Sequence, residues 1–114
     1  MVALTLVRPP VKVVPFPSTT VEATLRDELV EAVKIEASIR GVGLPVARAD
    51  IAKASVHIDS LVVVSILCAV EEIVGFEVPG SVVRVGGYTS VDSALGQLLP
   101  NLEKLWARKK GAES

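Results

Sequence analysis

Residue types that define several functional classes are scarce in this chain of 114 residues. It contains one cysteine, Cys68, and one histidine, His57, so it forms no internal disulfide and lacks the three or four nitrogen and sulfur ligands of a usual zinc site. Cys68 is expected to be a small buried residue rather than a reactive thiol. Since such sparse cysteine usage and the lack of a readable export signal are typical of a reducing compartment, we expect a cytoplasmic protein.

Aromatic residues and excess charge of one sign are scarce as well. Only 4% of the residues are aromatic, and 12 Lys and Arg against 13 Asp and Glu give a formal net charge of -1. Binding of nucleic acid usually needs a basic surface or aromatic stacking platforms, so no nucleic-acid partner is expected. No apolar run approaches the ~18 residues of a membrane-spanning helix, so we expect no membrane span.

Aliphatic residues are abundant, and their placement predicts one domain between two ends of different composition. Hydrophobic residues make up 50% of the chain, enough for the core of a single domain, which we place at residues 18–106. Residues 1–17 contain four prolines and are expected to be an extended arm, because proline prevents helix formation. This arm is either a tail without a role or a segment that lies against the domain or a partner through Val11, Val13, Val14 and Phe16. Residues 107–114 are expected to be a charged tail.

The first helix is expected from about residue 19 to residue 40. Thr19 and Glu22 have the spacing of a capping box at its start, and Gly41 is a typical helix stop. The apolar residues expected to face the core are Val21, Leu25, Leu29, Ala32, Val33 and Ile39. A loop is expected from residue 41 to residue 58, with inward anchors at Leu44, Val46, Ile51 and Val56.

The next helix is expected from Leu61 to about Val74, capped by Asp59 and Ser60 and stopped by Gly75. Its predicted inward stripe is Leu61, Val64, Leu67, Val70 or Glu71, and Val74. That stripe leaves Val62, Val63, Cys68 and Ala69 at least partly outward. Either they form a docking surface, or the helix is rotated or nearly wholly buried under the N-terminal arm.

The remaining chain predicts a short helix and a longer last one. Gly86 and Gly87 limit any helix between residues 81 and 85 to a turn or two. Thr89 and Asp92 form a second capping box, and Pro100 either ends the last helix or starts a further segment. Its expected core residues are Val91, Ala94, Leu95, Leu98 and Leu99, with Leu102, Leu105 and Trp106 docking beyond Pro100. The fold class is therefore all-α, a small helical bundle.

At Asp59-Ser60-Leu61 the chain resembles an acyl carrier protein, the small four-helix domain that carries a 4′-phosphopantetheine arm. The tripeptide opens a predicted helix, and Glu71 and Glu72 close that helix. The segments Phe76-Glu77-Val78-Pro79 and Thr89-Ser90-Val91-Asp92-Ser93-Ala94-Leu95 look like the connection and the capped last helix of that family. The resemblance covers about residues 19–99 and implies a four-helix bundle with a short third helix.

The resemblance implies that Ser60 is the attachment point of 4′-phosphopantetheine, derived from coenzyme A. It also implies that a phosphopantetheinyl transferase recognises the neighbouring Asp59, and it places Leu61 with these two residues in the cofactor-binding set. The position agrees with electrostatics, because the positive end of a helix dipole favours an attached phosphodiester. Without the resemblance, Asp59 and Ser60 would be read as an ordinary helix cap.

Two departures from the family pattern concern the neighbourhood of Ser60. His57 stands where the family usually has glycine; its imidazole either sits near the phosphate of the arm or is a solvated loop side chain. Val62 and Ser65 stand where typical members carry acidic residues. Residues 55–83 still hold four acids and neither Lys nor Arg, so the negative surface is reduced and displaced. The expected partner-docking residues are Val62, Val63, Ser65, Glu71 and Glu72.

The expected function is delivery rather than catalysis. His57, Asp59 and Ser60 lie too close in sequence to align as a hydrolytic triad, so we expect no enzyme. The resemblance implies a carrier that holds an acyl group as a thioester and presents it to enzymes of lipid or specialised-metabolite synthesis. Two alternatives stay open: an aminoacyl or peptidyl carrier, which suits the reduced acidity, and an unmodified carrier-like interaction module.

Overall fold

The computed structural model describes residues 15–113, with side chains to residue 110, and shows an all-α protein. Four α-helices follow one another along the chain: α1 (Ser18–Arg40), α2 (Arg48–Lys53), α3 (Ser60–Val74) and α4 (Val91–Glu113). A short 3-10 helix, η1 (Gly80–Val82), lies between α3 and α4. Within the described residues there is no β-strand, and a single antiparallel bridge joins Ile58 to Tyr88.

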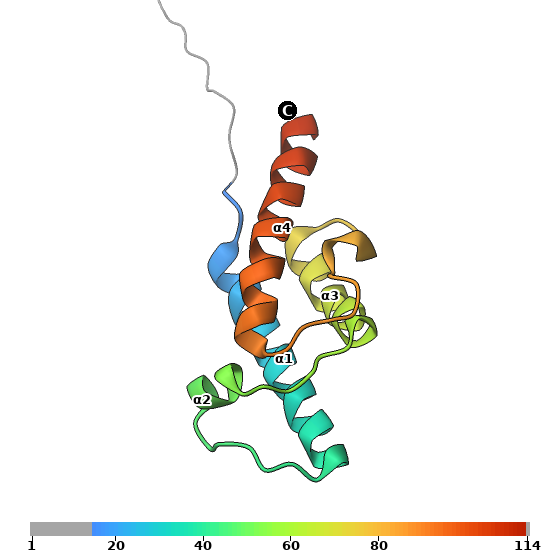
Figure 1. The fold of residues 1–114 in the computed structure, drawn as a ribbon. Coiled ribbons are helices and arrows are strands. Elements are labelled where there is room, and N and C mark those ends of the chain that lie inside the picture. Colours follow the sequence, from blue (N-terminus) through green and yellow to red (C-terminus); the bar gives the residue numbers. More distant parts are fainter. Residues whose placement is uncertain (1–14, 114) are drawn as a thin grey trace, which may run out of the picture.

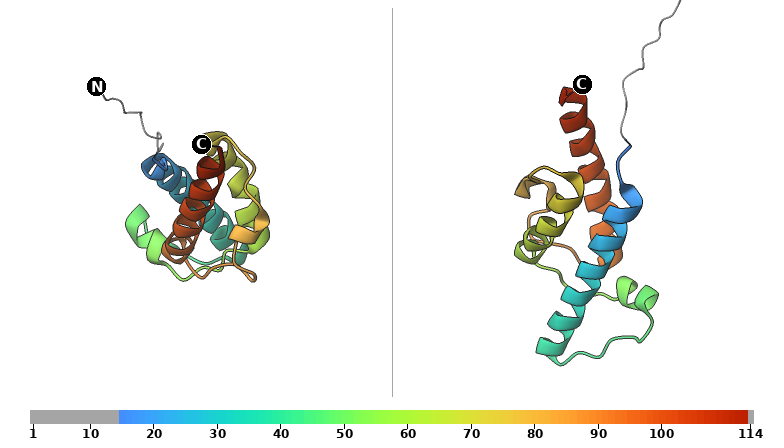
Figure 2. Two further views of the ribbon diagram at one scale, coloured as in Figure 1. Left: turned by 90° about the horizontal axis from the view of Figure 1, so that it is seen from above. Right: turned by 180° about the vertical axis from the view of Figure 1, so that it is seen from behind.

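Helix α1 is the centre of the arrangement, since it packs against α2, α3 and α4 (Figure 1). The chain enters α1 at the end of the bundle where α4 leaves it, and the last turns of α4 extend past the other helices (Figures 1 and 2). None of the described helices is both long and apolar enough to cross a membrane.

The core is built from one apolar stripe on each long helix. The fully buried members are Val21, Leu25, Leu29, Val30 and Val33 of α1, Val63, Leu67 and Val70 of α3, and Val91, Ala94, Leu98 and Leu102 of α4. No polar or charged side chain among the described residues belongs to the buried class. Removal of these aliphatic side chains from water is therefore the main stabilising contribution to the fold.

Glycines end α1 and α3 as the sequence predicts. Gly41 and Gly75 both have left-handed backbone angles, with φ of 71° and 81°, and their N–H groups donate to carbonyls of the last helical turn. The starts of the helices differ more from the prediction than their ends. Helix α1 begins at Ser18 without a side-chain cap, so the Thr19–Glu22 capping box is wrong. Helix α4 is capped by the Ser90 hydroxyl, which accepts from the Ser93 N–H at 3.0 Å.

Helix α2 lies in the segment that the sequence predicted as loop. It has only six residues and no side-chain cap, so local sequence gives it little support. Burial of Ile51 and Ala52 stabilises it, and Arg48 forms an ion pair with Asp27 of α1. Of the predicted loop anchors, Leu44 and Val56 pack against the core, whereas Val46 is 98% exposed and its prediction is wrong.

Helix α4 runs through Pro100 without a break, so neither predicted role of Pro100 is correct. Proline lacks an N–H and crowds the carbonyl four residues earlier, which here is Gly96. Both residues are exposed, so water can satisfy the freed carbonyl. Beyond the proline, burial of Leu102, Leu105 and Trp106 favours continuing the helix.

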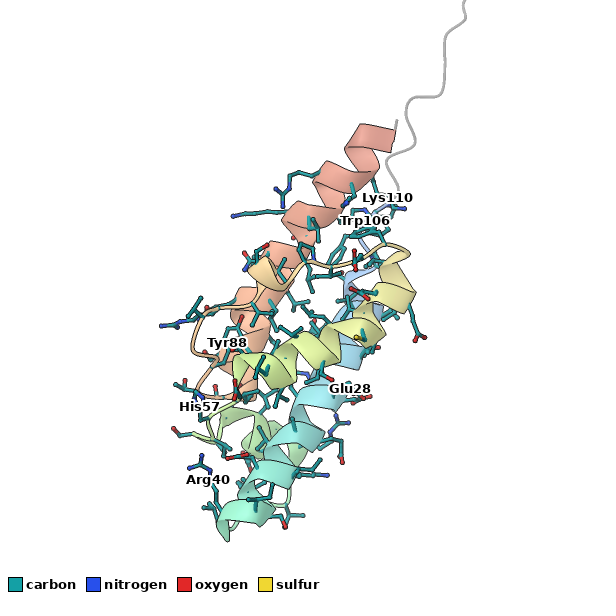
Figure 3. The ribbon with its side chains drawn as sticks, turned by 90° about the vertical axis from the view of Figure 1, so that its right-hand side faces the viewer. Glu28, Arg40, His57, Tyr88, Trp106 and Lys110 are labelled. Atoms are coloured by element: carbon teal, nitrogen blue, oxygen red, sulfur yellow. The ribbon has the colours of Figure 1, made fainter. Side chains whose placement is uncertain are left out.

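The structure describes residues 15–17 of the predicted arm, and Phe16 lies just before α1. Its ring packs edge-on against Trp106 of α4, with ring centroids 5.9 Å apart. Val11, Val13 and Val14 lie outside the described residues. The predicted charged tail begins on the same helix, where the Lys110 ammonium lies 4.9 Å from the Trp106 ring centroid (Figure 3).

Candidate functional site

Ser60 is the first residue of α3, and Asp59 caps that helix as the sequence predicts. One Asp59 carboxylate oxygen accepts from the Leu61 N–H at 3.0 Å. The Ser60 hydroxyl lies 3.4 Å from the same oxygen and is half-buried. The carboxylate thus satisfies one of the free N–H groups of the first turn and holds the start of α3 in place.

The chain in front of Ser60 is anchored to the chain in front of α4. The Ile58 N–H donates to the Tyr88 carbonyl at 2.8 Å, and the Tyr88 N–H donates back to Ile58 at 2.9 Å. Tyr88 is 1% exposed, and its hydroxyl accepts from the Arg84 N–H at 2.9 Å. Ser60 therefore begins α3 two residues after Ile58, whose backbone N–H and carbonyl are both hydrogen-bonded to Tyr88.

Gly87 makes this anchoring possible. A Cβ atom at this position would lie 2.1 Å from the Ile58 carbonyl oxygen and 3.1 Å from the Ser60 nitrogen. Its φ of +86° also belongs to the region that glycine adopts most easily. The sequence indicated a turn at Gly86 and Gly87. It did not indicate the close approach of Gly87 to Ile58, because the two residues are 29 positions apart and no local pattern records such a contact.

The predicted inward stripe of α3 is wrong, and the alternative of a rotated helix is confirmed. Val63 is fully buried, whereas Leu61 is 75% exposed and Val64 is 41% exposed. Cys68 is exposed, which agrees with the outward position that the predicted stripe gave it and contradicts its separate assignment as a small buried residue. The buried stripe is Val63, Ile66, Leu67, Val70 and Val74. Since α3 is apolar on nearly every side, its periodicity does not determine which side faces the core.

This rotation changes the set of residues that can dock a partner. Val62, Ser65 and Glu72 are exposed, as that role requires. Val63 is buried, so its assignment as a docking residue is wrong. Glu71 is half-buried, and its carboxylate accepts from the Val78 N–H at 2.8 Å, which fixes the connection after α3.

His57 is exposed and lines a small cavity of about 120 Å³ beside the start of α3. Arg40, from the end of α1, reaches the same cavity and forms an ion pair with Glu36 (Figure 3). The two basic side chains therefore lie on the side of Asp59 that faces α1. Within the described residues, no group of three or more His, Cys, Asp and Glu side chains is arranged to hold a metal ion.

An open groove of about 410 Å³ lies between α1 and α3, next to Ser60. Its lining is Glu28, Glu31, Ala32 and Ile35 from α1, and Leu61, Val62, Ser65 and Ile66 from α3. The sequence did not indicate a contribution from α1. The signal available in the sequence was Ile35, an apolar residue that is not among the predicted core residues of this helix. The structure leaves it 60% exposed, but periodicity alone does not separate it from the core.

The cap at Asp59 leads to a prediction about stability. Asp59→Ala removes the acceptor for the Leu61 N–H and is expected to lower the free energy of unfolding by about 1 kcal/mol. Asp59→Asn keeps an acceptor oxygen and should lose less than half as much. Urea denaturation followed by circular dichroism measures both; equal losses for the two variants would contradict a capping role.

Comparisons with known proteins identify no relative. No protein-family model matches the chain, and neither the curated proteins nor the solved structures contain a match. The functional proposal therefore depends on the residues and geometry described above.

Proposed function

We propose that this chain is an acyl carrier protein that holds its cargo on a 4′-phosphopantetheine arm attached to Ser60. The observation that carries the proposal is Asp59-Ser60-Leu61 at the start of a 15-residue helix in a small all-α protein. The order of the elements around it also supports the proposal. A long amphipathic helix precedes the serine, and a short 3-10 helix separates α3 from the last helix.

The side chains around Ser60 fit an attached phosphodiester. Ser60 is half-buried rather than enclosed, so its hydroxyl is open to a transferase. The first turn of α3 contains no acidic residue, and the helix dipole favours negative charge there. Asp59 is the nearest carboxylate, and its oxygen is engaged by the Leu61 N–H.

The residues of the chain position the arm, and the arm supplies a terminal thiol that forms a thioester with the cargo. Asp59 and the Ile58–Tyr88 bridge hold the Ser60 backbone in place. Tethering keeps the cargo at high effective concentration near an enzyme that binds the protein. Phosphopantetheinyl transferase and enzymes that load or transfer acyl groups are the proposed partners, and bond-making is left to them.

The proposal is tested by the mass of the intact protein. Incubated with coenzyme A, Mg²⁺ and a broad-specificity phosphopantetheinyl transferase, the wild type should gain the mass of one arm, and Ser60→Ala should gain none. Ser93 is a matched control because it also lies in the first turn of a helix, and Ser93→Ala should be modified like wild type. A wild type that stays unmodified with several such transferases refutes the proposal.

An aminoacyl or peptidyl carrier is a second candidate, favoured by the absence of acidic residues from the first turn of α3. Both candidates share the modified serine and differ in cargo. The mass of the protein from its native source, before and after mild cleavage of thioesters, identifies the cargo and separates them. An interaction module that works without modification, the third candidate, would show neither arm nor cargo.

A further inference from the structure

The groove between α1 and α3 is lined by three exposed apolar side chains. Leu61 is 75% exposed, Ile35 60% and Val62 41%, and all three line the same groove. The half-buried Ala32 and the buried Ile66 lie between them, so the groove floor is also apolar. A contiguous apolar surface of this kind marks a site of interaction.

The charged residues that line this apolar centre are both acidic. Glu28 and Glu31 line the α1 side, and neither helix places a Lys or Arg among the eight lining residues. Glu31 is paired with Lys34 at 3.4 Å, and both side chains are exposed. Glu28 forms no ion pair within the described residues, and Figure 3 shows it on α1 close to the point where α3 crosses in that view.

The basic residue nearest to Glu28 along α1 is turned to another helix. Arg26 donates to Glu22 at 3.0 Å and lies 3.6 Å from Asp92 at the start of α4. It is therefore held on the side of α1 that faces α4. Carboxylates beside an exposed apolar surface are complementary to an apolar segment flanked by Lys or Arg.

We propose that this groove is the docking surface for partner enzymes, and that they insert an apolar side chain flanked by Lys or Arg. The inference rests on the proposed carrier function and names the partner chemistry. The negative charge that α3 lacks at Val62 and Ser65 is supplied instead by α1 through Glu28 and Glu31. Since Leu61 follows Ser60 directly, a partner seated in the groove lies beside the attachment point of the arm.

A short helix-forming peptide with Leu on one face and Lys on the flanks is the probe. Titrated into the full chain and followed by amide NMR shifts, it should perturb residues 28–35 and 61–66. Ile35→Asp and Glu28→Lys should each raise the dissociation constant at least about tenfold, and the second effect should shrink with added salt. The same peptide with Glu in place of Lys should bind at least about tenfold more weakly than the Lys peptide.

Matched controls separate the groove from the rest of α1 and from general charge. Ile39 is 75% exposed on the same helix but does not line the groove, so Ile39→Asp should bind the peptide like wild type. Glu103→Lys on α4 makes the same charge change away from the groove and should also bind like wild type. Equal dissociation constants for Ile35→Asp and Ile39→Asp overturn the proposal.

Other occupants of the groove give distinct results. A wild-type dimer that Ile35→Asp dissociates, seen by sedimentation equilibrium, identifies a second copy as the occupant and overturns the proposal. Peptide binding that strengthens about tenfold when residues 1–14 are deleted assigns the groove to this chain's own N-terminal segment and also overturns it. Ser60→Ala should bind the peptide like wild type, so failure of the groove and failure of arm attachment are distinguishable.

Discussion

Gly87→Ala is expected to lower the free energy of unfolding by about 2–5 kcal/mol. The new Cβ would meet the Ile58 carbonyl oxygen at 2.1 Å, which forces the two segments apart and breaks the Ile58–Tyr88 bridge. Overpacking of this kind costs about 1–3 kcal/mol or more, and the positive φ adds about 1–2 kcal/mol. Urea denaturation followed by circular dichroism gives the free energy.

Gly86 provides a matched control next to it. Its φ is +91°, but a Cβ there would have no neighbour within 4 Å. Gly86→Ala should therefore lose only the backbone contribution of about 1–2 kcal/mol. Equal losses at the two positions would show that close approach to Ile58 is not what requires Gly87.

Gly87→Ala also tests how Ser60 is positioned. The new Cβ would lie 3.1 Å from the Ser60 nitrogen, so relief of the clash moves the start of α3. Under conditions where both variants are folded, Gly87→Ala should slow modification of Ser60 relative to Gly86→Ala. Equal rates of modification in the two variants would show that the proposed attachment at Ser60 does not depend on the position that Gly87 allows.

The sequence predicts the positions of α1 and α3 well, because the ends of these two helices carry local chemical signals. Gly41 and Gly75 stop α1 and α3, and Asp59 caps α3, each through bonds within a few residues. These signals depend on backbone angles and hydrogen bonds that the local residue types favour. The candidate site benefits directly, since the cap places Ser60 at the first helical position.

Tertiary burial, in contrast, decides the features that the sequence did not predict. Ile51 and Ala52 stabilise the short helix α2 only because α1 and α4 cover them. In the same way, burial of Leu102 and Leu105 carries α4 past Pro100. The local residue pattern does not show which distant part of the chain will cover these side chains.

The direction in which α3 faces is a third kind of difficulty. In Ser60–Val74, apolar residues occupy nearly every side, so several rotations bury a similar number of them. The buried Ile58 and its bridge to Tyr88 fix the chain just before the helix, and with it the rotation. As a result Val63 faces the core and Leu61 faces the groove, the reverse of the predicted assignment.

Trp106→Ala is expected to lower the free energy of unfolding by about 3–5 kcal/mol, as is usual when a large buried aromatic residue is removed. Trp106 is 9% exposed and contacts both Phe16, ahead of α1, and Phe76, after α3, with centroid distances of 5.9 and 6.1 Å. It therefore joins three segments that are distant in the sequence. Urea denaturation followed by far-UV circular dichroism measures the loss without depending on tryptophan fluorescence.

Trp106→Phe retains an aromatic ring and should lose less than half as much as Trp106→Ala, because contacts with Phe16 and Phe76 partly survive. Val85→Ala, at a position that is 94% exposed, should change the free energy by no more than about 0.5 kcal/mol. A loss below about 1 kcal/mol for Trp106→Ala would show that this end of α4 contributes little to the fold. Because Ser60 lies at the start of α3 and Phe76 follows its end, the folded fraction of Trp106→Ala should still accept the arm.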